Sequence, residues 1–325
     1  MRGGVLVVGG ANLDLIAVAG RLPARGETVI AHAYRESAGG KAANLACAAA
    51  AWGAPVSFVG RIGDDSFGDS LVRAWLEVGV DTTYVRRDPA GTGLGMVLMD
   101  ERGDYQTLVV PRANGRLSPD DVAALPESVW NDVRLVALAL EAPIDAMIAV
   151  ADAAVDHGLP LVLNAAPAEG MVDELWPAVS YVVVNEYEAG LLTGLDVADP
   201  KCAGTAGAAL SARLSVGRGK AAIVTLGALG AVVVSVDGTA RHVPAPSVEV
   251  VDSLGAGDTF VGVLAAEIAA DSELTRAVDA ACRAGAAAVT VYGARASVTR
   301  DRADDLGEGA SPSPAERPST KGVQA

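Results

Sequence analysis

The sequence contains few cysteines, few aromatic side chains and no excess of positive charge. Of its 325 residues 4% are aromatic, and three are cysteines, Cys47, Cys202 and Cys282. Their spacing is not that of a metal site, so we expect small apolar side chains in a reducing compartment. A formal net charge of −15 argues against nucleic acid as the main partner, because phosphate binding needs a basic surface. A small anionic ligand remains compatible with this charge, since a local site can be positive.

Long apolar segments are also missing. No uncharged run approaches the roughly 20 residues that a membrane-spanning helix needs. The N-terminal stretch "MRGGVLVVGGANLD" does not show the apolar region and cleavage site of a signal peptide. We therefore expect a cytoplasmic protein that does not interact with membranes.

Short apolar runs are frequent instead. They include residues 4–8, 133–140, 159–164, 180–184 and 221–224, and helix-forming stretches such as residues 143–158 separate several of them. Doubly buried runs that alternate with helices are typical of a parallel sheet with helices on both faces. The pattern predicts an α/β fold, and a hydrophobic content of 51% is enough to build its core.

A small β element is expected beside this core. Two separated segments, about residues 12–37 and 91–112, have strand-like patterns, and "DERGD" with Gly103 reads as the turn of a hairpin in the second segment. Residues 1–305 are expected to form one folded domain. Residues 306–325, which include "ASPSPAERPSTKGVQA", have the composition of a disordered tail.

Polar residues follow many of the apolar runs. In an open parallel sheet the carboxyl ends of the strands meet at one edge, where ligands bind. We expect that edge to gather Asn12, Asp14, Glu141, Asn164, Asn185, Thr225 and Gly227, together with residues 252–258, which follow the strand-like run "VEVV".

The stretch "DSLGAGDTF" is the most informative of these. Gly255, Ala256 and Gly257 precede Asp258, and an alanine-rich helical pattern follows. The first N–H groups of a helix have no partner within the helix, and glycines let an anion approach them closely. An acid in that turn would repel a phosphate as a ligand, but it can take a proton from a hydroxyl that attacks the phosphate. The alternative is an acid that only stabilises the helix dipole, for which the glycines are unnecessary.

A second glycine-rich helix entry is "SAGGKAANLA". Lys41 and Asn44 lie three residues apart and share one helical face, so both could donate hydrogen bonds to sugar hydroxyls. A plain turn with a solvated lysine is the simpler alternative. The sequence contains neither a Walker A loop nor the glycine fingerprint of dinucleotide-binding enzymes after its first strand, which speaks against a nicotinamide oxidoreductase.

Together these motifs resemble the ribokinase-like, or PfkB, family of carbohydrate and nucleoside kinases. The matching stretches are "GANLD", "GGKAANLA", "GRIGDDSFG", "NAAPA", "NEYEAGLLTG", "TLGALG" and "DSLGAGDTF", in family order over about residues 4–300. The last of these is highly specific, and the Gly-Gly-Lys motif is fairly specific. The resemblance implies a three-layer α/β/α core with a small β-sheet lid.

The resemblance also implies a role for each matching residue. Asp258 matches the catalytic base, and Gly255, Ala256 and Gly257 match the anion hole. The sugar-binding positions match Asn12, Asp14, Gly40, Lys41, Asn44 and Glu141. ATP-binding positions match Asn185, Thr225, Gly227 and Gly230, and Glu188 is implied to act indirectly on Mg²⁺. An activating K⁺ is implied near Asp252 and Ser297 and the carbonyls of Leu254, Ala288, Val291 and Gly293.

Three positions depart from the family pattern. Ser253 stands where threonine is frequent, Ala165 stands where proline is common, and Val291-Tyr292 replaces a basic pair or a proline. None of these departures removes a catalytic group. The tyrosine could alter nucleotide packing or cation affinity.

The expected activity is ATP-dependent phosphoryl transfer to a primary hydroxyl, with D-ribose to D-ribose 5-phosphate as the favoured reaction. Fructokinase, keto-deoxygluconate kinase and nucleoside kinases for pseudouridine or adenosine are alternatives within the family. A nucleoside needs an aromatic platform for its base, and the expected lid segments offer only Tyr34 and Tyr105. A non-catalytic sugar-binding protein is the alternative from another class, but it would be expected to lack the base or the glycine turn. The resemblance further implies a homodimer formed through the lid.

Overall fold

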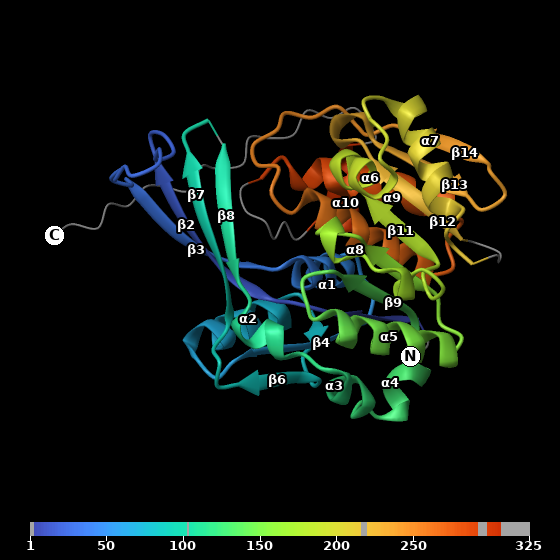
Figure 1. The fold of residues 1–325 in the computed structure, drawn as a ribbon, viewed down its shortest axis with the longest axis horizontal. Coiled ribbons are helices and arrows are strands. Elements are labelled where there is room, and N and C mark those ends of the chain that lie inside the picture. Colours follow the sequence, from blue (N-terminus) through green and yellow to red (C-terminus); the bar gives the residue numbers. More distant parts are fainter. Residues whose placement is uncertain (1–2, 103, 216–219, 292–297, 307–325) are drawn as a thin grey trace.

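The computed structural model describes residues 3–102, 104–215, 220–291 and 298–306. Its main body is one large sheet with helices on both sides, and a smaller sheet projects from one end (Figure 1). Gly103, Tyr292, Gly293, Ser297 and nearly all of the expected tail lie outside the described residues. No helix among the described residues is both long and apolar enough to cross a membrane.

The large sheet contains ten strands among the described residues. The central ones are parallel, and they are β5 (Val80–Asp81), β4 (Val56–Gly63), β1 (Gly4–Val8), β9 (Val133–Ala139), β10 (Leu161–Asn164), β11 (Tyr181–Val184) and β12 (Ala221–Thr225). β13 (Ala231–Ser235) and β14 (Ala240–Val243) continue the sheet antiparallel, and β6 (Val85–Asp88) pairs with β4. Val, Leu and Ala fill the central strands because both of their faces are buried.

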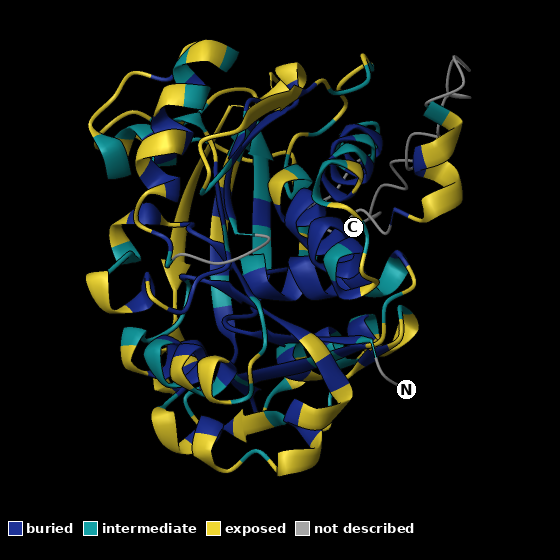
Figure 2. Cartoon of the chain, turned by 90° about the vertical axis from the view of Figure 1, so that its right-hand side faces the viewer, coloured by how far each residue is buried: buried dark blue, intermediate teal, exposed yellow. Residues whose placement is uncertain are grey.

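Helices cover both faces of this sheet. On one face α1 (Lys41–Ala51), α2 (Ser66–Glu77), α8 (Ala256–Ala269) and α9 (Leu274–Ala288) contribute to one hydrophobic core. On the other face a second core includes α3 (Pro119–Ala123), α4 (Glu127–Asp132), α5 (Ile144–Asp156), α6 (Glu186–Thr193) and α7 (Pro200–Ser211). Figure 2 shows the buried strands between helices whose outer sides are exposed. The expected three-layer α/β/α core is confirmed.

The smaller sheet is built from two separate stretches of the chain. Its strand order is β3 (Ala33–Gly39), β2 (Asn12–Ala19), β7 (Gly93–Asp100) and β8 (Tyr105–Val110). β2 runs parallel to β7, whereas β2–β3 and β7–β8 are antiparallel. Because side chains alternate along a strand, every second residue of each strand faces the core and the others face away from it.

One local expectation was wrong. Residues 248–251, the "VEVV" run, do not form a strand, and Val250 and Val251 are exposed. This run has no neighbouring strand to pair with and instead passes over the end of α9, where Val251 N–H donates to the carbonyl of Val289. Asn12 and Asp14 follow β1 as expected and lie on β2, a strand of the smaller sheet.

Candidate active site

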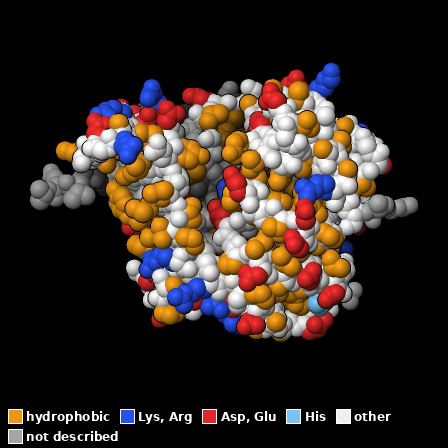
Figure 3. Space-filling view, viewed as in Figure 1, with side chains coloured by type: hydrophobic (Ala, Val, Ile, Leu, Met, Phe, Trp, Pro, Cys, Tyr) orange, Lys and Arg blue, Asp and Glu red, His pale blue; other side chains and the backbone are white. Residues whose placement is uncertain are grey.

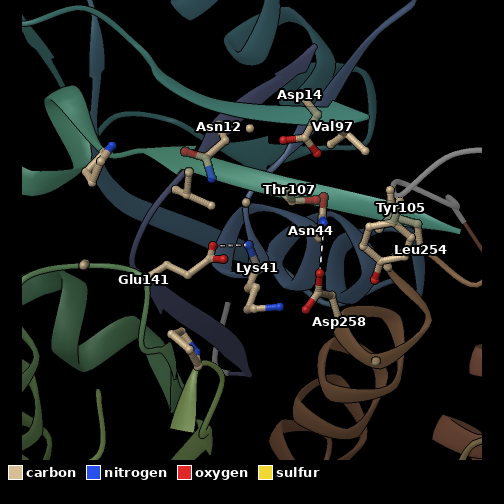
Figure 4. A pocket seen from close by; sticks show the side chains of 18 of the residues that line it. Asn12, Asp14, Lys41, Asn44, Val97, Tyr105, Thr107, Glu141, Leu254 and Asp258 are labelled. Carbon is tan, nitrogen blue, oxygen red and sulfur yellow. Dashed lines mark hydrogen bonds between the residues drawn. The ribbon is translucent and has the colours of Figure 1, made fainter. Parts of the chain in front are cut away.

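A cavity of about 760 Å³ lies between the smaller sheet and the carboxyl edge of the large sheet (Figure 3). Eleven of the residues expected at the site line it, which are Asn12, Asp14, Gly40, Lys41, Asn44, Glu141, Asn185, Leu254, Gly255, Gly257 and Asp258. The rest of its wall comes mainly from the core-facing side of β7 and β8, with Val97, Tyr105 and Thr107 (Figure 4). The fold therefore brings residues separated by more than 200 positions into one cavity.

Asp258 lies in the first turn of α8 and is buried at the floor of the cavity. Asn44 on α1 donates from its amide nitrogen to one carboxylate oxygen at 2.9 Å (Figure 4), and Asn164 at the end of β10 donates to the other at 3.5 Å. Burial raises the pKa of Asp258, while Lys41 and the bond from Asn44 oppose that rise. A carboxylate with a raised pKa and fixed orientation is suited to accept a proton.

The backbone around Asp258 leaves donors free for an anion. Gly255 is the N-cap of α8 and has a left-handed conformation with φ 77°. Among the described residues, the N–H groups of Gly257 and Asp258 have no hydrogen-bond acceptor. A Cβ on Gly257 would meet no atom within 4 Å, so the space next to this backbone is open. Free N–H groups at the start of a 14-residue helix can bind an anion.

The cavity gathers carboxylates around a single lysine. Glu141 follows β9 and accepts the backbone N–H of Lys41 at 2.7 Å (Figure 4). Burial by itself would lower the pKa of Lys41, but the charges of Asp258, Glu141 and Glu188 raise it. Burial raises the pKa of Glu141 and of Glu188, and Lys41 opposes both shifts. Lys41 therefore stays charged and offsets part of the negative charge at the cavity floor.

Asp14 projects from the core-facing side of β2. A Cβ on Gly39 or on Gly95 would come within 2.1 Å of its carboxylate oxygens, so glycine on both neighbouring strands makes room for this side chain. Burial, followed by the charges of Glu141 and Asp258, raises the pKa of Asp14 to about 7. The strand holds this carboxylate over the cavity and opposite α1 (Figure 4).

A second cavity, of about 390 Å³, adjoins the first. Thr225 ends β12, and Gly227 and Gly230 belong to the turn after it; all three line this cavity together with Ala256. Mostly apolar residues from the 245–250 segment and α9 complete it. Ser253 and Gly257 line both cavities. The start of α8 is therefore the place where the two cavities meet.

Asn185 and Glu188 bind each other at the start of α6. The Asn185 side chain accepts the N–H of Glu188 at 2.8 Å, and the Glu188 carboxylate accepts the N–H of Asn185 at 2.9 Å. This is a capping box, in which each side chain satisfies a free N–H of the helix end. The N-x-x-E spacing therefore has a structural role in addition to any role in binding.

The residues expected near a monovalent cation lie together beside the start of α8. The N–H of Asp252 donates to the carbonyl of Val289 at 3.2 Å, and its carboxylate accepts the N–H of Leu254 at 3.0 Å. Ala288 ends α9 and Val291 follows three residues later. The described members of this set offer oxygen atoms only, a donor type that suits a hard cation. Gly293 and Ser297 fall outside the described residues, so the structure places only part of the expected set.

Sequence reasoning gave no role to Asn164 or to Asn114. Asn164 was noted only because it ends the run "LVLN", and its bond to Asp258 depends on the neighbouring strands. Asn114 lies in the short helical turn η1 (Arg112–Arg116) and binds Asn12 across 102 positions of the chain. No local pattern in "PRANGRLSP" signals this contact.

Comparison with known proteins gives a consistent result. The profile of the pfkB family carbohydrate kinases matches residues 3–301. A ribokinase of Schizosaccharomyces pombe is 32% identical over 302 residues, which is 90% of this chain and 94% of that protein. A deoxyribokinase of Salmonella typhi is 32% identical over 296 residues, with 90% and 94% covered.

Solved structures agree with the sequence comparison. The structure of Arabidopsis thaliana ribokinase complexed with ribose and ATP superposes with a TM-score of 0.83 at 30% identity, covering 94% of this chain and 99% of that chain. The profile match extends over nearly all of the folded residues and includes both glycine-rich helix starts. The chain belongs to the pfkB family of carbohydrate kinases, phosphotransferases with an alcohol group as acceptor.

Proposed function

We propose that this protein is an ATP-dependent sugar kinase that phosphorylates D-ribose on its primary hydroxyl, giving D-ribose 5-phosphate. The observation that carries the proposal is the position of Asp258. This buried carboxylate lies beside free backbone N–H groups where a polar cavity and a mostly apolar cavity meet. One cavity has the character of a sugar site and the other that of a site for a nucleobase. The names of several relatives point the same way.

Each group has a definite part in the proposed reaction. Asp258 removes the proton of the primary hydroxyl as the oxygen attacks the γ-phosphorus of ATP. The N–H groups of Gly255, Ala256 and Gly257 are assigned to binding the transferred phosphoryl group and stabilising its charge, for which Ala256 gives up its 3.4 Å bond to the carbonyl of Ser253. Lys41 supplies a positive charge near Asp258. ADP leaves through the second cavity, and the proton remains on Asp258 until product release.

The sugar is held by the polar wall of the first cavity. Asp14 and Glu141 accept hydrogen bonds from its hydroxyls, and Asn12, Lys41 and Asn44 donate to them. Gly40 has φ 93° and its missing Cβ would lie 2.8 Å from the Cα of Ala11, so glycine is required for α1 to begin so close to β2. Alternation of donors and acceptors suits a small polyol better than an apolar group.

ATP is proposed to occupy the second cavity with its base near Gly227 and Gly230. Its phosphates then reach the start of α8 past Thr225 and Asn185. The carboxylate of Glu188 lies near this end, and one of its oxygens is not used by the capping box, so it can hold a water ligand of Mg²⁺. Bound Mg²⁺ would supply charge neutralisation for the phosphates of ATP.

A substrate panel tests this function. Purified protein with ATP and Mg²⁺ is offered ribose, 2-deoxyribose, fructose, keto-deoxygluconate, pseudouridine and adenosine, and ADP release is measured. The proposal requires the highest kcat/KM with ribose. A preference for a nucleoside or a hexose would leave the family membership intact but replace the substrate. ADP release that no acceptor stimulates would favour a binding protein over a kinase.

Potassium dependence is the first prediction. If Asp252 and the carbonyls of Leu254, Ala288 and Val291, with Gly293 and Ser297, hold K⁺, the ion stabilises the turn that carries the free N–H groups. Exchange of K⁺ for tetramethylammonium should lower kcat about 10-fold or more, the loss expected when one preorganised electrostatic contact is disturbed. Choline at the same ionic strength serves as a control for bulky cations. Equal rates in K⁺ and in both organic cations would mean that no such site operates.

Dimerisation through the smaller sheet is the second prediction. Val97, Tyr105 and Thr107 face the cavity, so the alternate residues Met96, Leu98, Leu108 and Val110 face outward and are exposed, Leu108 by 70%. Hydrophobic side chains gather over this sheet (Figure 3). We propose that two copies cover these faces by pairing, so that each smaller sheet acts as a lid for its own cavity. The smaller sheet has four strands and is covered on one side, so its other side exposes apolar surface to water. Pairing two copies removes this surface from water and lowers the free energy.

Sedimentation checks this assembly. The unmodified protein should sediment as a dimer at micromolar concentration, and Leu108→Lys should shift it to a monomer. Leu76→Lys, at an exposed leucine of α2, is the matched control and should leave the dimer intact. A monomeric unmodified protein would refute the pairing. Cys47 and Cys282 are buried thiols that form no disulfide within the described residues, which fits the proposed cytoplasmic location of such an enzyme.

A further inference from the structure

The chain crosses between the large and the smaller sheet at four places within the described residues. These are residues 8–12, 39–41, 91–93 and 110–112, each at the end of a strand of the smaller sheet. Any movement of the smaller sheet over the cavity must be absorbed there. The turn η1, which follows the last crossing, contacts two of the other crossings through side chains of Arg112 and Asn114.

Asn114 makes the central contacts of this region. It is only 2% exposed, and its amide binds the first crossing three times. Its Oδ1 accepts the backbone N–H of Ala11 at 2.9 Å, and its Nδ2 donates to the carbonyl of Ala11 at 2.9 Å. The same Nδ2 donates to Oδ1 of Asn12 at 2.8 Å. The amide of Asn114 thus imitates a neighbouring β-strand at Ala11 and also reaches the side chain of Asn12.

The polarity of these bonds follows from the backbone. The N–H of Ala11 can only donate, so the atom of Asn114 that faces it must be the oxygen. The other end of the Asn114 amide must then be the NH₂ group, and its second hydrogen points to Asn12. The atom of Asn12 that accepts this hydrogen must be its oxygen. The Nδ2 of Asn12 therefore takes no part in these bonds, and it has no acceptor among the described residues.

The leftover nitrogen belongs to a residue that lines the cavity. Asn12 is 3% exposed, and Figure 4 shows its amide nitrogen on the side of Lys41 and Glu141. The surroundings are shaped for the asparagine pair. A Cβ on Gly93 would lie 2.3 Å from Nδ2 of Asn114 and 2.4 Å from Oδ1 of Asn12, and a Cβ on Gly10 would lie 3.4 Å from Cγ of Asn114.

We propose that Asn114 is a positioning residue for sugar binding, which makes Asn12 a pure hydrogen-bond donor in the cavity. The inference rests on the proposed sugar kinase function and adds a specificity element to it. Asn12 then binds a lone pair of a sugar oxygen, whereas Asp14, two residues further on the same face of β2, takes hydroxyl hydrogens. Asn12 therefore recognises a sugar oxygen as a hydrogen-bond acceptor, whereas Asp14 recognises sugar hydroxyls as donors. Asn114 determines that Asn12 acts as a donor.

The third prediction uses Asn114→Asp to test this relay, by which Asn114 fixes the orientation of the Asn12 amide toward the sugar. The carboxylate keeps the bond from the N–H of Ala11 but cannot donate, so the Asn12 amide turns over and presents its oxygen to the sugar. KM for ribose should rise about 5-fold, the worth of one neutral hydrogen bond, while KM for ATP changes less than 2-fold. Asn131→Asp, at an exposed asparagine of α4, is the matched control for the added charge and should change neither constant.

Asn12→Asp gives a second test that keeps the hydrogen bond between Asn114 and the side chain at position 12. An aspartate at position 12 still accepts from Nδ2 of Asn114, so the fold should persist, but the donor toward the sugar is lost. KM for ribose should again rise about 5-fold or more. If Asn12 instead presented its oxygen to the sugar, the aspartate would bind ribose at least as well as asparagine does, and the proposed polarity would be wrong.

A double-mutant cycle separates positioning from a general structural role. In the Asn12→Ala background, Asn114→Asp should raise KM for ribose less than 2-fold, because its target is gone. An undiminished effect in that background would overturn the relay. The inference and the proposed function fail differently. If the unmodified protein phosphorylates no sugar, the function is wrong; if it phosphorylates ribose and Asn114→Asp leaves KM unchanged, only the relay is wrong.

Discussion

Asp258→Asn is expected to lower kcat by at least about 100-fold, the usual contribution of a general base. The amide has the same shape as the carboxylate and can keep a hydrogen bond with Asn44, but it cannot take the proton of the attacking hydroxyl. Binding of ATP should persist, because the free N–H groups at the start of α8 remain. Turnover is measured by ADP release with saturating ribose, and ATP binding by calorimetry.

The pH profile adds a second readout to the same prediction. Burial raises the pKa of Asp258, so the ionised base is lost at a higher pH than for an exposed aspartate. In the unmodified protein kcat should therefore fall as the pH decreases through this raised pKa, and the residual activity of Asp258→Asn should lack that fall. Asp237→Asn, in an exposed turn, is the matched control and should behave like the unmodified protein. Near-normal turnover of Asp258→Asn would remove this residue from the mechanism.

Asp14→Ala is expected to lower kcat/KM for ribose by about 10- to 100-fold. A carboxylate can accept from two neighbouring hydroxyls of one ring face, and the loss of one hydrogen bond to a charged group costs about 1.5–3 kcal/mol, which corresponds to this range. The same argument predicts that 2-deoxyribose is a poorer substrate of the unmodified protein by about 10-fold or more, because one acceptor position of a buried carboxylate would be left unpaired. Asp14→Ala should flatten this preference.

The control for Asp14 must keep the cavity polar. Asp14→Asn retains the shape of the side chain and one hydrogen-bond acceptor, so its kcat/KM for ribose should lie between those of the unmodified protein and Asp14→Ala. Because the pKa of Asp14 is raised to about 7, the unmodified protein should also bind ribose better as the pH rises through that value, whereas Asp14→Asn should not. Equal use of ribose and 2-deoxyribose by the unmodified protein would show that Asp14 does not read the 2-hydroxyl. This question is open in the family, since one relative is a deoxyribokinase.

Much of the fold could be predicted because local pattern and global fold agree. Residues 135–139, for example, are apolar throughout, which is the composition of a strand buried on both faces. The glycines before Asp258 mark the helix start because an ordinary helix cap does not require them. These signals lie within a few residues of one another, so they are visible in the sequence alone.

The remaining features depend on contacts between distant segments. "VEVV" has the composition of a strand, but no strand edge is available to it, and the run stays irregular. The capping box of Asn185 and Glu188 could have been noticed from spacing. Asn114 could not, since its partners lie more than 100 residues away and are reached only after both sheets have formed.

Transfer of labelled phosphate to ribose tests the central claim most directly. The unmodified protein is incubated with ATP labelled in its γ-phosphate, Mg²⁺, K⁺ and ribose, and the labelled sugar is identified. The account predicts label in ribose 5-phosphate with the unmodified protein and almost none with Asp258→Asn. Label that remains in ATP or appears only as inorganic phosphate would contradict a sugar kinase, and equal labelling by both proteins would contradict the role of Asp258.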